Sequence, residues 1–97
     1  SRKGRAGMTD DRVNFSDIHV GRRTFTAAEQ ANSFRKWASG HTMTRMELEW
    51  ILRLEMSLRD PRRYAAYACA EYMIKKMKRA GVITYSGKKW HLVGAQK

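Results

Sequence analysis

The sequence predicts a mainly α-helical domain of three helices that ends in a C-terminal β-hairpin. The segments 26–29 and 44–47 both read Thr-x-x-Glu, the spacing of a capping box, in which each side chain satisfies a free backbone N–H at a helix start. An Asp-Pro pair at 60–61 marks a third helix start. After Gly81 the apolar period shortens from about 3.6 residues to 2, which indicates strands.

Length and composition limit the class of protein. A chain of 97 residues with 42% hydrophobic residues and three tryptophans suits one globular domain rather than a disordered chain. No apolar run approaches the roughly 20 residues of a membrane span, and no apolar signal segment follows the basic N-terminus. Cys69 is the one cysteine, so it has no internal disulfide partner. We therefore expect an intracellular, cytoplasmic protein without a membrane partner.

The chain divides into a basic, partly flexible arm at 1–24, a domain at 25–93 and a tail at 94–97. The arm is mostly polar, but some of its apolar residues approach alternation, which predicts a short strand or an extended segment docked on the core. These anchors are Val13, Phe15, Ile18 and Val20.

The first helix is expected to begin after Thr26 and to run to about Ser39, with Gly40 as a left-handed stop. One face of this helix carries small and aromatic residues, and Trp37 borders that face. The residues expected there are Ala27, Ala31, Phe34 and Ala38.

The second helix is expected from Arg45 to about Leu58, and it is the most apolar of the three. Residues four apart form a stripe along it, Leu48 and Leu52 add to its apolar character, and we expect this helix to be the centre of the core. The stripe consists of Met46, Trp50, Leu54 and Leu58, widened by Ile51.

The third helix is expected from Pro61 to Gly81, which supplies its left-handed stop. Its apolar stripe contains Ala65, Cys69, Met73, Met77 and Ala80. The segment 82–85 is rich in β-formers, 86–89 has the composition of a turn, and 90–93 is the returning strand. An isolated hairpin is not stable in water, so this one must pack on the helices.

Charge is the strongest functional signal in the sequence. Twenty Lys and Arg stand against nine Asp and Glu, which gives a net charge of +11. Residues 59–97 carry ten of the basic and only two of the acidic groups, whereas residues 25–58 carry four of each. So uneven a distribution favours a polyanionic partner: nucleic acid first, and an acidic protein as the alternative.

The order of three helices and a basic hairpin resembles the winged helix-turn-helix superfamily over roughly residues 26–93. In that superfamily a helix packed on two others is followed by a glycine, a strand, a basic wing and a second strand. The residues that carry the resemblance are Met73, Met77, Gly81, Val82, Ile83, Gly87, Lys88, Lys89, Trp90 and Leu92. The resemblance implies binding of double-stranded DNA, although winged helices also serve as protein-interaction modules.

The resemblance also assigns candidate contacts. Side chains near the N-terminal end of the third helix would meet base edges in the major groove, and these are Arg62, Arg63, Ala66 and Tyr67. The wing tip would reach the minor groove or backbone with Lys88 and Lys89. Phosphate contacts are expected from Lys75, Lys78, Arg79, Arg45, Arg22 and Arg23. Both the second and the third helix are long for a compact helix-turn-helix, so we expect the N-terminal turn of the third helix to extend beyond the packed core.

Nothing in the sequence predicts catalysis, a cofactor or a metal site. The histidines at 19, 41 and 91 are scattered, and Cys69 falls on an apolar stripe. We expect a small transcriptional regulator, of the size and charge common among phages and mobile elements. The alternatives are an interaction module in a replication, packaging or host-takeover complex, and an RNA or single-strand binder. Homodimers that read palindromes are common in this superfamily, so the oligomeric state stays open.

Overall fold

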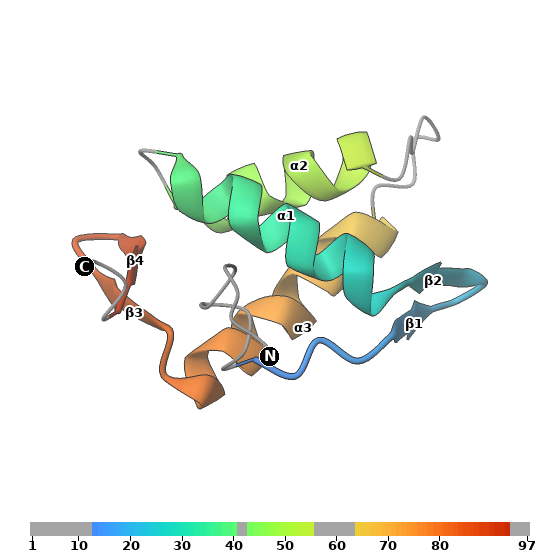
Figure 1. The fold of residues 1–97 in the computed structure, drawn as a ribbon. Helices are drawn as coiled ribbons and strands as arrows, with labels where there is room; N and C mark the ends of the chain where they lie inside the picture. Colours follow the sequence, from blue (N-terminus) through green and yellow to red (C-terminus); the bar gives the residue numbers. More distant parts are fainter. Residues whose placement is uncertain (1–12, 41–42, 56–63, 94–97) are drawn as a thin grey trace.

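The computed structural model describes residues 13–40, 43–55 and 64–93, which form three helices and two small antiparallel hairpins (Figure 1). The mainly helical class and the C-terminal hairpin are therefore confirmed. In chain order the elements are β1 (Ile18–Val20), β2 (Arg23–Phe25), α1 (Ala27–Ser39), α2 (Arg45–Glu55), α3 (Tyr64–Ala80), β3 (Ile83–Ser86) and β4 (Lys89–Leu92).

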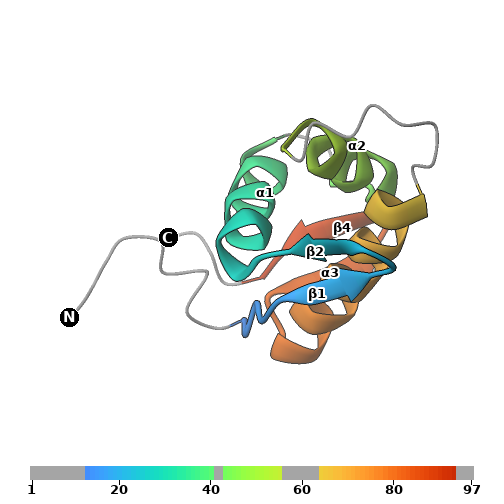
Figure 2. The same cartoon turned by 90° about the vertical axis from the view of Figure 1, so that its right-hand side faces the viewer.

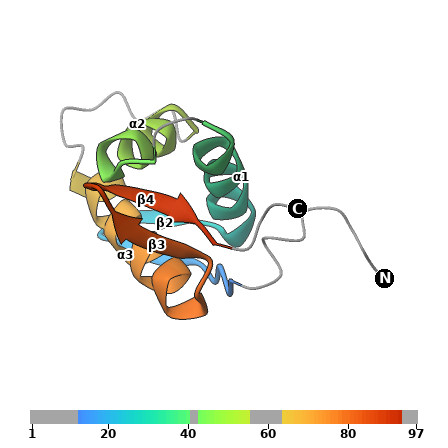
Figure 3. The same ribbon diagram turned by 90° about the vertical axis from the view of Figure 1, so that its left-hand side faces the viewer.

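The helices lie between the two hairpins. Helices α1 and α2 lie over α3, with β1–β2 at one end of the molecule and β3–β4 at the other (Figure 1). After turns of 90° to either side, both hairpin tips point in the same direction as the first residues of α3 (Figures 2 and 3). Helix α1 lies on the side away from the tips. The fold thus gathers two turns and one helix end on one side.

Both predicted capping boxes are present. At α1 the Glu29 N–H donates to Thr26 Oγ1 at 3.2 Å, and the Thr26 N–H donates to Glu29 Oε1 at 2.9 Å. At α2 the Glu47 N–H donates to Thr44 Oγ1 at 3.2 Å, and the returning bond is 3.5 Å long. Each box satisfies backbone donors that have no partner inside the helix.

The prediction of a left-handed stop at Gly40 is wrong. Gly40 has φ −80° and ψ 170°, an extended conformation, although its N–H still donates to the Trp37 carbonyl at 3.2 Å. The indole Nε1 of Trp37 donates to the Thr44 carbonyl at 2.9 Å, which holds the start of α2 against the end of α1. The chain therefore leaves α1 without needing a residue at positive φ.

The stop at Gly81 is confirmed and has the form of a Schellman motif. Gly81 has φ 78°, its N–H donates to the Lys78 carbonyl at 3.0 Å, and the Val82 N–H donates to the Met77 carbonyl at 3.1 Å. The expected start of this helix at residue 61 and the turn at 57–60 lie outside the described residues.

The C-terminal hairpin is closed by a two-residue turn. Ser86 pairs with Lys89, and the residues between them, Gly87 and Lys88, have φ 59° and 66°. Positive φ at both central residues defines a type I′ turn, whose twist matches the twist of paired strands. The strands are thus one residue closer to the tip on each side than the sequence predicts, because the turn needs two residues rather than four.

The second helix does contribute to the core, but not through the expected stripe of residues four apart. Leu48 and Leu52 are fully buried, whereas Met46, Trp50 and Leu54 are 75%, 60% and 59% exposed. The two sets lie on opposite sides of α2, because a step of two residues turns a helix by about 200°. Helices α1 and α3 cover the side with the two leucines. Leu58 lies outside the described residues.

The buried face of α1 also differs from the expected one. Phe34 is buried as expected, but the residues that share its face are Gln30, Ser33 and Trp37, while Ala27 is exposed. Large rings remove more apolar surface from water than methyl groups do, so Phe34 and Trp37 decide the orientation. Gln30 is tolerated inside because its amide nitrogen donates to the carbonyls of Ser16 and Phe25, both at 2.8 Å.

The docked segment expected before the first helix is present. Val13, Phe15 and Ile18 are buried in the same core as the helices, and the rings of Phe15 and Phe34 lie 5.8 Å apart. Residues 18–20 pair with 23–25 as a hairpin, a detail that the sequence did not show. Of the predicted arm at 1–24, the segment 13–18 therefore packs on the domain, and the hairpin that follows it carries an exposed tip.

Candidate nucleic-acid interface

The C-terminal hairpin tip presents two lysines. Lys88 and Lys89 are exposed, and neither forms an ion pair within the described residues. Behind the tip, the half-buried Trp90 packs its ring against that of the exposed Tyr85, with centroids 4.9 Å apart. The strands thus rest on the core through Trp90 while the two charges face solvent.

The N-terminal hairpin forms a second basic tip. Gly21, at φ 60°, makes the turn, and Arg22 and Arg23, which follow it, are exposed. Across the strands, the His19 Nδ1 and the Thr24 Oγ1 share a hydrogen bond of 3.0 Å. Because this tip points to the same side as the other one (Figures 2 and 3), the arginines and lysines can face one ligand.

The outer face of α3 completes the surface. Lys75, Lys78 and Arg79 are exposed because Met73 and Met77 turn the opposite side of the helix into the core. Tyr64 and Tyr72 are exposed on the same outer face. The structure therefore places the three expected phosphate contacts of α3 in solvent on one element.

Ala66 does not belong to this surface. Its side chain is 0% exposed and forms part of the core. The sequence-based expectation that Ala66 lets α3 approach DNA closely is therefore wrong. Ala66 lies on the same side of α3 as Met73 and Met77, two and three turns further along, and α2 packs against this helix. A small residue at this position serves helix packing.

Arg45 is held by α3. Its guanidinium forms an ion pair with Glu71 and lies over the Tyr67 ring, 4.8 Å from the ring centroid. A cation above a ring is attracted by the negative face of the ring. Arg45 and Tyr67 are partly exposed, so both can still touch a ligand, but from a fixed position. Arg62 and Arg63, the expected base contacts, lie outside the described residues.

A groove between α3 and the segment that leads into β1 was not expected from the sequence. It has a volume of about 450 Å³ and is lined by Ser16, Asp17, Ile18, His19, Tyr72, Lys75, Lys76 and Arg79. The spacing of 72, 75, 76 and 79 places these side chains on one flank of a helix, a signal that sequence reasoning could have used. What the sequence did not show is the opposite wall.

Lys76 joins the two walls of this groove. Its ammonium donates to the Ser16 carbonyl at 2.8 Å, to Ser16 Oγ at 3.3 Å and to Gln30 Oε1 at 3.5 Å. Partial burial lowers the pKa of Lys76, because removing water disfavours the charged form. Lys76 therefore acts first as a structural cation.

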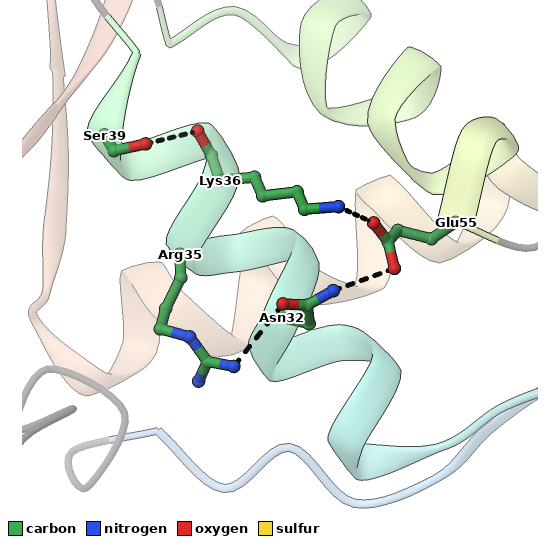
Figure 4. A network of polar contacts seen from close by, with 5 residues as sticks. All are labelled: Asn32, Arg35, Lys36, Ser39 and Glu55. Atoms are coloured by element: carbon green, nitrogen blue, oxygen red, sulfur yellow. Dashed lines mark hydrogen bonds and ion pairs between the residues drawn. The ribbon is translucent and has the colours of Figure 1, made fainter.

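A polar network joins α1 to α2 away from this surface (Figure 4). Glu55 accepts a hydrogen bond from Asn32 at 2.8 Å and forms an ion pair with Lys36. The bond to the Lys36 ammonium is the main reason that the pKa of Glu55 lies below its usual value. These charges are used within the fold, unlike those at the hairpin tips.

Other kinds of site find little support in the described part of the chain. Cys69 is buried, and burial raises the pKa of its thiol to about 12, so the thiol is protonated at neutral pH. Within residues 13–40, 43–55 and 64–93, no three His, Cys, Asp or Glu side chains are grouped to hold a metal ion. In the same ranges, no helix combines the length and the apolar character that a bilayer crossing requires.

Comparisons of the chain with protein-family models, with curated proteins and with solved structures gave no match.

Proposed function

We propose that the protein binds double-stranded DNA through one surface formed by α3 and the two hairpin tips, and that it acts as a small transcriptional regulator. The observation that carries this proposal is a set of seven exposed cations without an ion pair among the described residues. They are Arg22, Arg23, Lys75, Lys78, Arg79, Lys88 and Lys89. Exposed cations on α3 and on both hairpin tips match the phosphate charge of a duplex.

Lys88 supports this proposal through its backbone. It is the one non-glycine residue at positive φ in the described part of the chain. At this φ a residue with a side chain is less stable than glycine by roughly 1–2 kcal/mol. Strained positions of this kind cluster at functional sites. The presence of lysine rather than glycine at the second position of this turn therefore indicates that Lys88 serves through its charge rather than in folding.

The connectivity supports a winged helix-turn-helix arrangement as the finer fold. The Trp90 N–H donates to the Met43 carbonyl at 3.0 Å, so the segment before α2 adds a third backbone partner to the β3–β4 hairpin. In that arrangement α3 enters the major groove and the hairpin tip follows the backbone. The longest dimension of the protein, 39 Å, is close to one helical turn of DNA, which is about 34–36 Å.

The direct test is fluorescence anisotropy with a labelled duplex over a range of salt concentrations. The Lys88→Gln/Lys89→Gln variant should bind more weakly, and its salt slope should fall by up to about 1.8, because each phosphate contact contributes about 0.9. The control is Arg35→Gln/Lys36→Gln on α1, which removes equal charge on the side away from the tips. An equal loss in both variants, or no binding at about 50 mM salt, would reject the proposal.

A second candidate function is recognition of an acidic amphipathic helix of another protein. It is favoured by the apolar stripe of Met46, Trp50 and Leu54, which faces solvent on α2. The net charge of +11 would attract an acidic partner, and apolar anchors spaced four residues apart suit a helix face. Crosslinking that survives nuclease treatment and is lost in Trp50→Gln would support this function in place of DNA binding.

A further inference from the structure

We propose that the groove between α3 and the segment 16–19 binds a single nucleotide unit, with the base on Tyr72 and the phosphate on Lys75 and Arg79. The nucleotide is either free or an unpaired residue of a nucleic-acid strand. Lys75 and Arg79 belong to both proposed sites, whereas Tyr72 belongs to the groove alone and Lys88 and Lys89 to the duplex surface alone, so the two proposals can fail separately.

The charged side chains that line the groove favour the binding of an anion. Its lining contains three cationic side chains, Lys75, Lys76 and Arg79, and one carboxylate, Asp17. Asp17 is already engaged, because its Oδ1 accepts a hydrogen bond of 3.0 Å from the Ala27 N–H at the start of α1. With Lys76 bonded to Ser16, the cations left for a ligand are Lys75 and Arg79, both of them exposed.

The ring of Tyr72 adds a surface for a base. Tyr72 is 50% exposed and lines the groove next to the cations. Lys75 lies about 4.5 Å and Arg79 about 10.5 Å further along the helix axis, at about 1.5 Å per residue. A base stacked on Tyr72 therefore leaves its phosphate within reach of flexible cationic side chains. Aromatic stacking of this kind accepts any base.

The wall opposite α3 is held in place. The Ser16 carbonyl accepts hydrogen bonds from both Lys76 Nζ and Gln30 Nε2, each at 2.8 Å. Ile18, two residues further on, is buried in the core. A wall fixed in this way costs little ordering when a ligand binds. The volume of about 450 Å³ also lies in the usual range for small-molecule sites, about 300–1,000 Å³.

The experiment is an NMR titration of the ¹⁵N-labelled chain with thymidine monophosphate, thymidine, inorganic phosphate and a single strand of ten thymidylates. We expect the nucleotide to shift the amide signals of residues 16–19 and 72–79, and to bind more tightly than thymidine or phosphate. Tyr72→Ala and Arg79→Gln should each weaken the nucleotide at least about 5-fold. The control Lys88→Gln/Lys89→Gln should leave it unchanged.

The strand identifies the source of the nucleotide. If the ten-thymidylate strand binds more tightly than the mononucleotide, and Tyr72→Ala removes this difference, the groove binds an unpaired residue of a strand. If the affinity per nucleotide is the same for both ligands, the groove binds a free nucleotide. The proposal is overturned if nucleotide at about 10 mM shifts none of these amide signals, because a dissociation constant above roughly that value is too weak to assign to a site. It is also overturned if phosphate alone binds as tightly and Tyr72→Ala has no effect. Duplex binding by Tyr72→Ala and by Lys88→Gln/Lys89→Gln shows independently whether the proposed function holds.

Discussion

The backbone N–H of Trp90 donates a 3.0 Å hydrogen bond to the carbonyl of Met43, which fastens β4 to the segment that leads into α2. One strand of the C-terminal hairpin is therefore hydrogen-bonded to the segment between two helices, which fixes the position of the hairpin. Trp90 also supports Tyr85 on the neighbouring strand. A rigidly placed tip is what a basic hairpin needs if its lysines are to meet phosphates at fixed positions.

Lys88→Gly should stabilise the protein while weakening DNA binding. Glycine adopts φ 66° without strain, so the free energy of unfolding should rise by about 0.5–1 kcal/mol. The lost charge should weaken duplex binding at the same time. Urea denaturation and anisotropy measure the two effects. Lys89→Gly is the matched control, since Lys89 lies in a strand at negative φ and should lose both stability and affinity.

Gln30→Leu should destabilise the protein by about 1–3 kcal/mol. The substitution removes the buried donor that serves the Phe25 carbonyl, and a buried acceptor without a partner carries its full desolvation cost, whereas the Ser16 carbonyl keeps its bond from Lys76. Urea denaturation measures the loss. Ala28→Leu, at an exposed position of the same helix, should change stability by no more than about 0.5 kcal/mol. Equal effects of the two substitutions would show that the buried amide bonds are not needed.

Stability should fall in acid partly through Glu55. Its pKa is lowered in the folded protein from 4.5, mainly by Lys36, so the folded state holds the carboxylate more strongly than the unfolded chain does. This contribution is complete above the unfolded pKa and disappears as the pH falls through the lower, folded value. Lys36 is more than half exposed, so screening limits the effect to about 1 kcal/mol or less.

The measurement for Glu55 is thermal unfolding between pH 6 and pH 3, a range chosen to span the usual glutamate pKa of about 4.3. Glu55→Gln should show a flatter decline of Tm with falling pH than the unchanged chain. Added salt should reduce the difference. Parallel declines in the two proteins would exclude Glu55 as a source of the acid sensitivity.

Two neighbouring residues of α2 should respond to truncation very differently. Leu52→Ala should cost about 2–5 kcal/mol, since Leu52 is fully buried and its loss leaves a cavity. Trp50→Ala should change stability by no more than about 0.5 kcal/mol, because Trp50 faces solvent although it is the larger side chain. Urea midpoints of both variants measure this contrast. A comparable loss in Trp50→Ala would mean that another part of the protein covers the outer stripe.

Most of the secondary structure could be predicted from short, local sequence patterns. The capping boxes at Thr26 and Thr44 and the stop at Gly81 each depend on a few neighbouring residues, and all three are present in the fold. The charge of the hairpin tip is equally local, since Gly87 and Lys88 form the turn and Lys89 follows it. These features need no knowledge of what lies across the molecule.

The orientation of α2 could not be predicted in the same way. This helix is apolar on two opposite sides, one with Leu48 and Leu52 and the other with Met46, Trp50 and Leu54. Periodicity identifies an apolar stripe but does not choose between two of them. Ala66 was misassigned for a related reason, since a small residue suits a close approach to DNA and a close approach of α2 equally well.

The sequence by itself determined the starts of α1 and α2, the stop at Gly81, the basic hairpin and the concentration of charge in residues 59–97, because each is set by short-range chemistry or by composition. Only the tertiary structure decided which faces are buried, that residues 16–19 form the second wall of a groove, and that both basic tips point to one side (Figures 2 and 3). Those features depend on how distant segments share a single core, where Gln30 and Lys76 bond to Ser16 across 14 and 60 residues of chain.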